Sequence, residues 1–522
     1  MRKKVLIIGA GIAGLAAGCY GQMNGFDTEI FELHDLPGGL CTAWERKGYI
    51  FDGCIHYLFG SGPDQPFNDL WRELGALEER RMIDHEAFMQ VRSPDGQQLT
   101  VYCDPDRLAA HMKEISPGDA ELIDDLAEGV REFVQFDMSV MQQKPKSLMS
   151  PQDWQAFGMQ MMPFVAPLAK WGMLSAAGFA RRFHHPFLQR AVAQMFAWPE
   201  IPMMAGLSLL AYMHTHNAGF PAGGSLAFAQ AIERRYLALG GKIHYKAQVE
   251  KILVEPLPGA PALFPLPLTP TPRKRAAALR LYDDSIHRGD YIISAADGRG
   301  TIFDLLGGEF TNRKIENLYD GDLPLRPQVQ VSLGVNRDLS TEPHWAMYLL
   351  EEPLLIAGRE YTEIGIKHYC FDPSLAPAGK SSVVVMLESP YAYWQRIYGR
   401  RLYDTEQAQV AEIVIDFLER LYPGIKQEIE VTDVATPLSF ERYTGNWQGS
   451  CCGWLLTTET MRLMIEGVAK TLPGLEDFYM AGQWVEPGGS VPLAAASGRN
   501  AIQLICHAEG QKFAAGMGAG PA

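Results

Sequence analysis

The sequence predicts an α/β fold with a parallel sheet at its core, and three observations lead to this prediction. Residues 5–8 form a continuous apolar run that is followed by closely spaced glycines and a stretch that favours a helix. A glycine turn, a helical stretch and a strand-like run return after Gly219, and residues 291–294 form another apolar run. Such runs are typical of strands buried on both faces of a parallel sheet. The chain of 522 residues is long enough for more than one domain.

The composition is that of an ordinary globular protein, and it limits the partners of the chain. With 46 Lys and Arg against 61 Asp and Glu, the formal net charge is −15. Because an acidic chain repels the phosphate backbone, we expect no nucleic-acid partner. The eight cysteines show no CxxC pair, which argues against zinc or disulfides and favours a reducing compartment. We find no secretory signal and no apolar run of membrane-spanning length, and we expect a cytoplasmic protein.

Residues 5–32 read as a strand, a glycine-rich turn, a helix and a second strand. Gly9 permits a tight turn, Gly11 lets the backbone approach a pyrophosphate, and Gly14 lets helix and strand pack closely. The helix N-terminus offers free N–H groups and a positive dipole end to phosphates. Glu32, 18 residues after Gly14, can accept hydrogen bonds from ribose hydroxyls, and no Arg follows it to bind a 2′-phosphate. The segment therefore predicts a dinucleotide site, which fits NAD as well as FAD.

Three later segments decide between these dinucleotides. They are residues 37–41 (PGGLC), 46–56 (RKGYIFDGCIH) and 478–506, which begins FYMAG and contains EPGGSVP. With the N-terminal motif, this layout resembles the phytoene desaturase-like flavoproteins, which include bacterial carotenoid desaturases, carotenoid cis–trans isomerases and retinol saturase-like enzymes. The resemblance implies that the cofactor is FAD. No second GxGxxG segment is present, so we expect no built-in NADPH site.

The resemblance also implies which residues hold the FAD. The first glycine turn with Ala13 would line the pyrophosphate, and Glu32 would bind the adenosine ribose. Residues 38–40 would run beside the ribityl chain, the backbone of Val249 would touch adenine, and residues 482–491 would cover the pyrimidine end of the flavin. The last placement has an independent reason, since a helix N-terminus stabilises the negative charge of a reduced flavin. The predicted cofactor-binding residues are Gly9, Gly11, Ala13, Gly14, Glu32, Gly38, Gly39, Leu40, Val249, Gly482, Gly488, Gly489 and Val491.

The same patterns divide the chain into two domains, of which the first is discontinuous in sequence. The predicted Rossmann-like FAD-binding domain takes in residues 1–75, 220–300 and 436–506, and the predicted substrate domain takes in 76–219 and 301–435. Alternating apolar residues in 329–335 and 382–387 predict antiparallel strands in the substrate domain. We expect this domain to contain a mixed sheet, and its first segment to form an α-helical, apolar lid. The Gly- and Ala-rich tail, 507–522, is predicted to be disordered.

The predicted lid, residues 155–213, is rich in Met, Phe, Trp and Ala. Such side chains adapt to irregular apolar ligands, although an ordinary helical core has the same composition. Between residues 139 and 199, six basic residues and one acid give a charge of 6 − 1 = +5. Basic residues interleaved with large apolar ones suit a helix lying on an anionic membrane. We therefore hypothesise that this lid collects a lipophilic substrate through peripheral contact with an anionic membrane.

Residues 52–56 hold the best candidates for side chains that face the flavin. In the resembled family a glycine often stands at the place of Cys54, so this residue departs from the pattern and leaves the transfer of desaturase chemistry open. Cys54 and His56 are candidate catalytic residues that could tune the flavin or donate a proton. A packed cysteine and a hydrogen-bonded structural histidine are the alternative. No GxSxG or HExxH motif offers another kind of catalysis, and we expect no metal site.

The sequence thus predicts a FAD-dependent oxidoreductase acting on carbon–carbon bonds of a long apolar substrate, of the isoprenoid, carotenoid or lipid type. The resembled family spans desaturation, saturation and flavin-assisted isomerisation, and the sequence does not distinguish them. One alternative is a flavin amine oxidase. The other is a non-catalytic lipid- or prenyl-binding carrier like the Rab GDP-dissociation inhibitors, against which the intact Gly9, Gly11 and Gly14 argue. The oligomeric state is left open.

Overall fold

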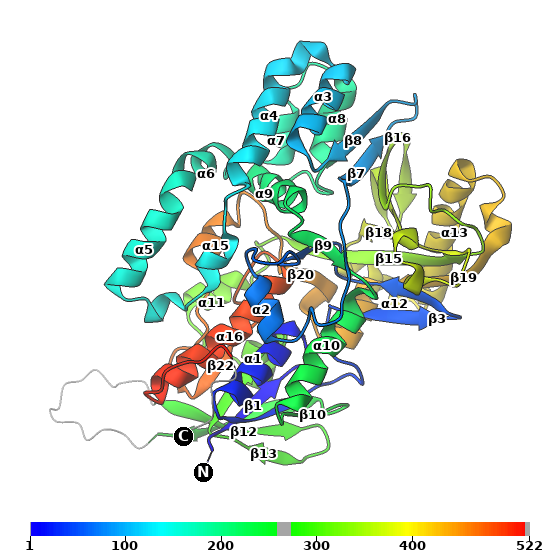
Figure 1. The fold of residues 1–522 in the computed structure, drawn as a ribbon. Coiled ribbons are helices and arrows are strands. Elements are labelled where there is room, and N and C mark those ends of the chain that lie inside the picture. The colour runs from blue at the N-terminus through cyan, green and yellow to red at the C-terminus, as the bar shows by residue number, and fades with distance from the viewer. Residues whose placement is uncertain (1, 258–272, 517–522) are drawn as a thin grey trace.

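A five-stranded parallel sheet organises one half of the computed structural model, which describes residues 2–257 and 273–516 (Figure 1). Its strands, in spatial order, are β10 (Lys242–His244), β2 (Asp27–Phe31), β1 (Lys4–Ile8), β14 (Tyr291–Ser294) and β22 (Phe478–Met480). All neighbouring strands run parallel. The predicted α/β class is therefore confirmed, and strands far apart in the sequence meet in one sheet.

Both faces of this sheet are covered, which explains the continuous apolar run of β1. Val5 and Ile7 belong to the hydrophobic cluster with the helices, whereas Leu6 and Ile8 belong to the cluster with an antiparallel sheet. The helices are α1 (Ile12–Met23), α10 (Gly224–Ala238) and α16 (Val491–Ala508), and the antiparallel strands are β11 (Val249–Pro256), β12 (Lys274–Leu281) and β13 (Ile286–Arg288). Because neither face meets water, every residue of the strand after Lys4 can be apolar.

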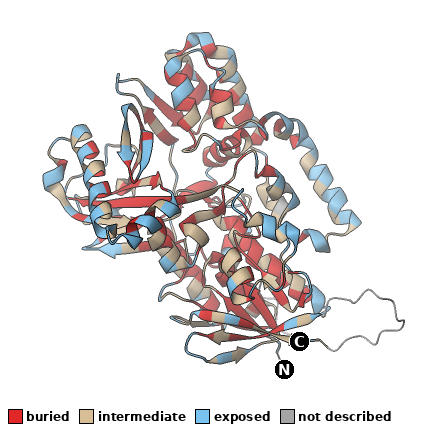
Figure 2. Ribbon diagram, turned by 180° about the vertical axis from the view of Figure 1, so that it is seen from behind, coloured by how far each residue is buried: buried red, intermediate tan, exposed pale blue. Residues whose placement is uncertain are grey.

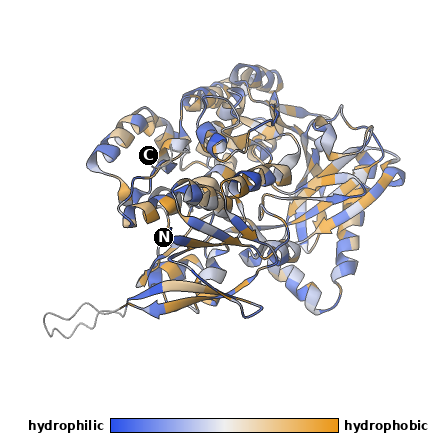
Figure 3. Cartoon of the chain, turned by 60° about the horizontal axis from the view of Figure 1, so that its bottom comes forward, coloured by the Kyte–Doolittle hydropathy of each residue, from blue (hydrophilic) through white to orange (hydrophobic). Residues whose placement is uncertain are grey.

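The second large sheet is mixed, as predicted, and its neighbouring strands are antiparallel except for the parallel pair β7 and β16. In spatial order the strands are β19 (Ile429–Ala435), β15 (Leu325–Val335), β18 (Ser381–Glu388), β17 (Arg359–His368), β16 (Trp345–Ile356), β7 (Ala87–Arg92) and β8 (Gln98–Tyr102). Figure 3 shows these strands on the right, with bands of orange and blue that reflect alternating side chains. β20 (Ser450–Trp454) also pairs with β15. Part of the range 436–506 therefore belongs to this sheet, although the prediction placed it in the cofactor domain; the division into domains stays a prediction.

A helical region lies between β8 and the parallel sheet along the chain. Its helices are α3 (Pro105–Ile115), α4 (Ala120–Phe133), α5 (Pro151–Met161), α6 (Val165–Trp171), α7 (Ala176–Ala180), α8 (Pro186–Gln194) and α9 (Met203–His214). Trp171, Met195 and Met203 are buried in its core, so part of the predicted lid is ordinary helical core. None of the residues of α5 is buried. This helix stands away from the body in Figure 1 and is mostly pale blue in Figure 2.

Shorter elements connect these parts. The strands are β3 (Ala43–Arg46), β4 (Tyr49–Asp52), β5 (Leu58–Phe59), β6 (Met82–Ile83), β9 (Ala218–Pro221) and β21 (Leu475–Glu476). The helices are α2 (Asn68–Glu73), α11 (Arg313–Leu318), α12 (Tyr391–Gly399), α13 (Tyr403–Leu421), α14 (Pro437–Thr444) and α15 (Met461–Glu466). β4 contacts both β18 and α10. The loop that follows β4 therefore lies between the parallel half of the molecule and the mixed sheet.

Residues 507–516 of the C-terminal tail pack against the body of the protein, so the prediction of disorder is wrong for them. α16 extends to Ala508. Beyond it, the backbone N–H of Ala514 donates to Asn24 Oδ1 at 2.7 Å, and the ring of Phe513 lies 5.7 Å from that of Tyr20. One aromatic side chain thus holds an otherwise small and polar segment against α1. Residues 517–522, and 258–272 of the predicted cofactor domain, lie outside the described residues.

Three further features bear on function. Within residues 2–257 and 273–516, no helix combines the length and the apolarity needed to cross a membrane. Over the same ranges, no group of three or more His, Cys, Asp or Glu side chains is arranged to hold a metal ion. All eight cysteines are free thiols.

Candidate functional site

The turn between β1 and α1 is a backbone cradle in which side chains have little room. Gly9 has a φ of +94°, a conformation that L side chains rarely adopt. A Cβ on Gly14 would lie 1.9 Å from the carbonyl oxygen of Gly9, whereas a Cβ on Gly11 would meet nothing closer than 3.9 Å. α1 begins after Gly11 without a side-chain cap, so its first N–H groups are available to an anion. This geometry suits a phosphate.

Glu32 follows β2 beside this turn, and its carboxylate is buried. Oε2 accepts a hydrogen bond from the backbone N–H of Ala10 at 2.6 Å, and Oε1 accepts one from His34 at 2.8 Å. Burial raises the pKa of Glu32, and these two N–H groups act in the opposite direction. The carbonyl oxygen of Glu32 accepts a hydrogen bond from Ala247 at 2.8 Å, which brings the segment of Val249 close. The residues predicted to contact ribose and adenine therefore lie near each other.

Two distant segments join the glycine turn. Gly38 forms an isolated parallel bridge with Gly11, and its N–H donates to the carbonyl oxygen of Ala10 at 2.9 Å. Gly482 follows β22, and a Cβ on it would lie 3.4 Å from the Cβ of Ala13. Segments from both ends of the chain thus meet at one place. The predicted residues gathered here are Gly9, Gly11, Ala13, Gly14, Gly38, Gly39 and Gly482.

A cavity of about 930 Å³ begins beside this cluster. The predicted site residues in its wall are Leu40, Cys54, His56, Gly488, Gly489 and Val491. Strands β15 to β18 form its floor, and helices α5, α6 and α9 contribute apolar side chains to the opposite wall. These apolar residues include Phe157, Met161, Leu168 and Met204. A space of this size accommodates a long ligand.

The loop after β4 is held by the buried carboxylate of Asp52. Oδ1 accepts hydrogen bonds from the backbone N–H of Cys54 at 3.0 Å and from Ser225 Oγ at 2.7 Å, and Oδ2 accepts one from the Ser225 N–H at 2.6 Å. Ser225 Oγ in turn accepts a hydrogen bond from Ile55 at 2.7 Å. Burial raises the pKa of Asp52, and these hydrogen bonds oppose the rise. A Cβ on Gly224 would lie 2.4 Å from Oδ2, so only glycine permits this close approach.

The candidate catalytic residues His56 and Cys54 both line the cavity. Nδ1 of His56 is buried and has no hydrogen-bond partner among the described residues. Burial lowers the pKa of His56 well below its usual value, and the positive charges of Lys367 and Arg326 act in the same direction. Cys54 lies next to Cys41, whose pKa is raised by a hydrogen bond with Cys54 and by burial. A neutral imidazole with a free nitrogen is therefore available at the cavity wall.

Sequence reasoning missed the side chains that the mixed sheet contributes to the cavity. They include Arg326, Gln328, Trp345, Met347, Arg359, Tyr361 and Lys367 from β15 to β17, and Cys451 and Cys452 from β20. Alternation along a strand, as from Tyr361 to Lys367, shows which of them share a face. It does not show that this face meets the cofactor residues, because that depends on how the sheet packs against the loop after β4.

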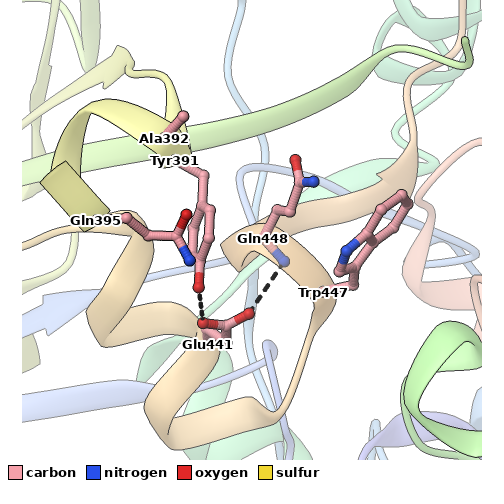
Figure 4. A pocket seen from close by; sticks show the side chains of 6 residues that line it. All are labelled: Tyr391, Ala392, Gln395, Glu441, Trp447 and Gln448. Atoms are coloured by element: carbon pink, nitrogen blue, oxygen red, sulfur yellow. Dashed lines mark hydrogen bonds between the residues drawn. The ribbon is translucent and has the colours of Figure 1, made fainter. Parts of the chain in front are cut away.

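A second, smaller cavity of about 320 Å³ lies between α12 and the segment 441–448 (Figure 4). The carboxylate of Glu441 accepts hydrogen bonds from the hydroxyl of Tyr391 and, at 3.2 Å, from the backbone N–H of Gln448. None of the predicted site residues lines this cavity. The predicted site residues that line a cavity therefore line the larger one.

Comparison with known proteins agrees with the predicted cofactor. Residues 12–506 match the family described as flavin containing amine oxidoreductase. The chain belongs to this family. It is a FAD-dependent oxidoreductase, so the predicted enzyme class and cofactor are confirmed.

Two relatives of this flavoenzyme cover most of its length. The phytoene desaturase (lycopene-forming) of Pseudescherichia vulneris is 24% identical over 541 residues, which cover 96% of this chain and 99% of that protein. The chloroplastic prolycopene isomerase of Arabidopsis thaliana is 23% identical over 517 residues, which cover 94% of this chain and 81% of that protein. Both names lie within the family that the sequence resembles.

Solved structures share the fold of this flavoenzyme. An oxidoreductase from Methanosarcina mazei has a TM-score of 0.60 at 18% identity, and the match covers 96% of this chain and 100% of that one. Putrescine oxidase bound to putrescine has a TM-score of 0.57 at 13% identity, with 97% and 99% covered. At such identities the likeness shows the fold alone.

The residues present fit the pyrophosphate, ribose and flavin parts of FAD. The glycine turn and the start of α1 would hold the pyrophosphate, and Glu32 the ribose. α16 begins after Ser490 without a side-chain cap, and it points its N-terminus at the cavity through Val491. A helix N-terminus placed there favours the reduced, anionic flavin. Bound FAD supplies a hydride acceptor or donor; the individual residue contacts stay predictions.

We expect Glu32→Gln to weaken FAD binding. The amide keeps the size of the side chain but loses the charge, and its NH2 group would oppose one of the two backbone N–H donors at 2.6 and 2.8 Å. The loss of charge-assisted hydrogen bonds corresponds to an affinity about tenfold to a hundredfold lower. Two measurements test this expectation. They are the flavin content after purification and the Kd for FAD when the flavin-free protein is reloaded.

Glu29→Gln, on the strand that ends just before Glu32, is the matched control. Glu29 pairs with Lys4 at 2.9 Å and does not approach the glycine turn. This variant should keep the full flavin content. Equal FAD affinity in the Glu32 variant and in wild type would remove Glu32 from the predicted cofactor site.

Proposed function

We propose that this oxidoreductase acts on carbon–carbon bonds of a long apolar substrate of the polyene or isoprenoid type. The observation that carries the proposal is the cavity of about 930 Å³, which runs from the predicted flavin-facing residues to the apolar helices α5, α6 and α9. An elongated hydrocarbon would fill such a space and place one bond beside the flavin. The names of the relatives from Pseudescherichia vulneris and Arabidopsis thaliana support this substrate class.

The side chains of this protein would act mainly by positioning. Met161, Leu168 and Met204 provide a flexible apolar wall that adapts to a ligand and excludes water. The Asp52–Ser225 hydrogen bonds hold the loop after β4, so that the reacting carbon would meet a fixed surface. Amine oxidation is less well supported, since the likeness to putrescine oxidase at 13% identity concerns the fold alone.

Mixing the holoenzyme with a polyene under anaerobic conditions tests this proposal. With phytoene in detergent micelles, we expect the flavin absorbance to bleach and a longer chromophore to form if the enzyme desaturates. With prolycopene, an isomerase would change the double-bond geometry without net redox change. Analysis of the products by chromatography separates the two outcomes.

Putrescine serves as the matched amine in the same assay. Bleaching of the flavin by putrescine and by neither polyene would support amine oxidation instead. Lipid extracted from the purified protein gives a second measurement, and a bound polyene or fatty acid would name the substrate class.

We propose that His56, as a neutral imidazole, donates a hydrogen bond to the reacting ligand or accepts a proton from it. His56→Ala should lower kcat by about a hundredfold or more, the usual contribution of a general acid or base, with flavin content retained. His368→Ala is the control, because His368 is buried behind the same sheet and bonds to the carbonyl oxygen of Pro343 at 2.8 Å. Unchanged turnover in the His56 variant would exclude this role.

We further propose that α5 and α6 make peripheral contact with a membrane. Large apolar side chains are exposed on these helices and in the segments that adjoin them, among them Met159 at 59%, Met162 at 69% and Met173 at 70%. The charge of +5 in this region overstates its free charge, because Lys144 pairs with Asp153 and Lys170 with an acid of α4. Apolar insertion should therefore contribute more than attraction to anionic lipid. The cytoplasmic location stays a prediction.

Replacing Met159 and Met162 by glutamate should reduce vesicle binding by about tenfold or more, because two apolar side chains would no longer enter the interface. Flotation with neutral and with anionic vesicles measures it. Ile286→Glu, a change of an apolar residue that is 56% exposed on β13, is the control. Wild-type protein that floats with neither vesicle would contradict the membrane proposal.

A further inference from the structure

Lys367 is a buried lysine in the wall of the large cavity. It lies on β17, where Tyr361, Glu363, Gly365 and Lys367 alternate and all line the cavity. Only 7% of Lys367 is exposed. Lysine is almost never buried to this extent without a partner of opposite charge. A negatively charged partner of Lys367 is therefore expected in or near the cavity.

No carboxylate within the described residues forms an ion pair or hydrogen bond with Lys367 Nζ. Nζ lies 3.5 Å from the centroid of the Trp345 ring. The charge of Asp52 acts on Lys367, but both oxygens of Asp52 already accept hydrogen bonds from Ser225 and Cys54. Burial lowers the pKa of Lys367 well below its usual value, and the charge of Asp52 offsets this only in part.

The other acids of the cavity, Glu200, Glu363 and Glu388, form no ion pair with Lys367 within the described residues. The charge of Glu200 acts on Arg359. Glu388, which also lines the cavity, pairs with Arg359. Glu363 accepts a hydrogen bond from the hydroxyl of Thr362. An ammonium group taken out of water without a counter-charge is costly. A ligand that brings an anion into the cavity would remove this cost.

We propose that Lys367 binds the carboxylate end of an amphipathic substrate whose apolar chain extends toward the lid. This rests on the proposed function, which places a long apolar substrate in the same cavity. A carboxylate matches the site because one ammonium group beside an aromatic face neutralises a single negative charge. At the far end, Met161 and Leu168 offer only apolar surface.

The arrangement also predicts which part of the substrate reacts. The ring of His56 lies 5.7 Å from that of Trp345, so the lysine and the predicted flavin-facing loop share one end of the cavity. A carboxylate held by Lys367 would bring the neighbouring carbon–carbon bonds to that loop. The reacting bond would therefore lie near the polar end of the chain rather than at its apolar tip.

Equilibrium dialysis of the flavin-loaded enzyme against oleate and against methyl oleate tests the proposal. The two probes share the apolar chain and differ in the negative charge. We expect wild type to bind oleate about tenfold more tightly or better, as is usual for a charge-assisted hydrogen bond. Lys367→Met should remove the preference for oleate and leave the affinity for methyl oleate unchanged. Lys426→Met, which changes an exposed lysine paired with Asp416, should behave as wild type.

Equal affinities for the two probes in wild type would overturn the proposal without the need for any variant. A preference for oleate that persists in Lys367→Met would also overturn it. If methyl oleate binds and oleate binds no more tightly, the proposed role of Lys367 is excluded, but the proposed apolar substrate is not. If neither probe binds to a yellow, flavin-loaded enzyme, the proposed apolar substrate fails as well.

Discussion

The close approach of α1 to the glycine turn and to α16 is the constraint on which the rest of the structure depends. A Cβ on Gly14 would lie 1.9 Å from Gly9 O, and a Cβ on Gly498 would lie 2.2 Å from Ala13 O. These contacts between backbones bring the C-terminal helix against the first helix of the chain. As a result, the segment after β22 reaches the phosphate-binding turn, and a flavin can be held by both ends of the sequence.

A second constraint is the buried carboxylate of Asp52. A carboxylate removed from water is tolerated only when hydrogen bonds replace its hydration. Ser225 and the N–H of Cys54 provide them, and in doing so they connect α10 with the loop after β4. The negative charge of the same carboxylate also acts on Lys367 and partly offsets the effect of burial on its pKa. One buried carboxylate thus holds the loop after β4 in place and also influences the charge of a lysine in the cavity wall.

The cavity combines two kinds of surface that serve different purposes. Its floor is formed by the mixed sheet, whose hydrogen-bonded strands fix the positions of the polar side chains that they carry. Its roof on α5 and α6 is apolar and partly exposed, with Met162 at 69%. A fixed floor suits the orientation of a reacting bond, whereas a roof of flexible side chains suits substrates of irregular shape. Folds of this kind host many reactions, so the contents of the site determine the chemistry.

The nucleotide-binding unit was determined by the sequence alone, because strand, glycine turn, helix and Glu32 are close along the chain and each has a local physical reason. Alternation also predicted antiparallel strands of the second sheet, such as β15 and β18. Long-range packing decided the rest. The pairing of β20 with β15, the salt bridge that uses Lys170 and the seat of Phe513 against Tyr20 all join distant segments, and local patterns do not report such contacts. Only the tertiary structure could show that Lys367 faces the cavity. Alternation shows which residues share one face of a strand, but only the packing of the sheet shows what that face contacts.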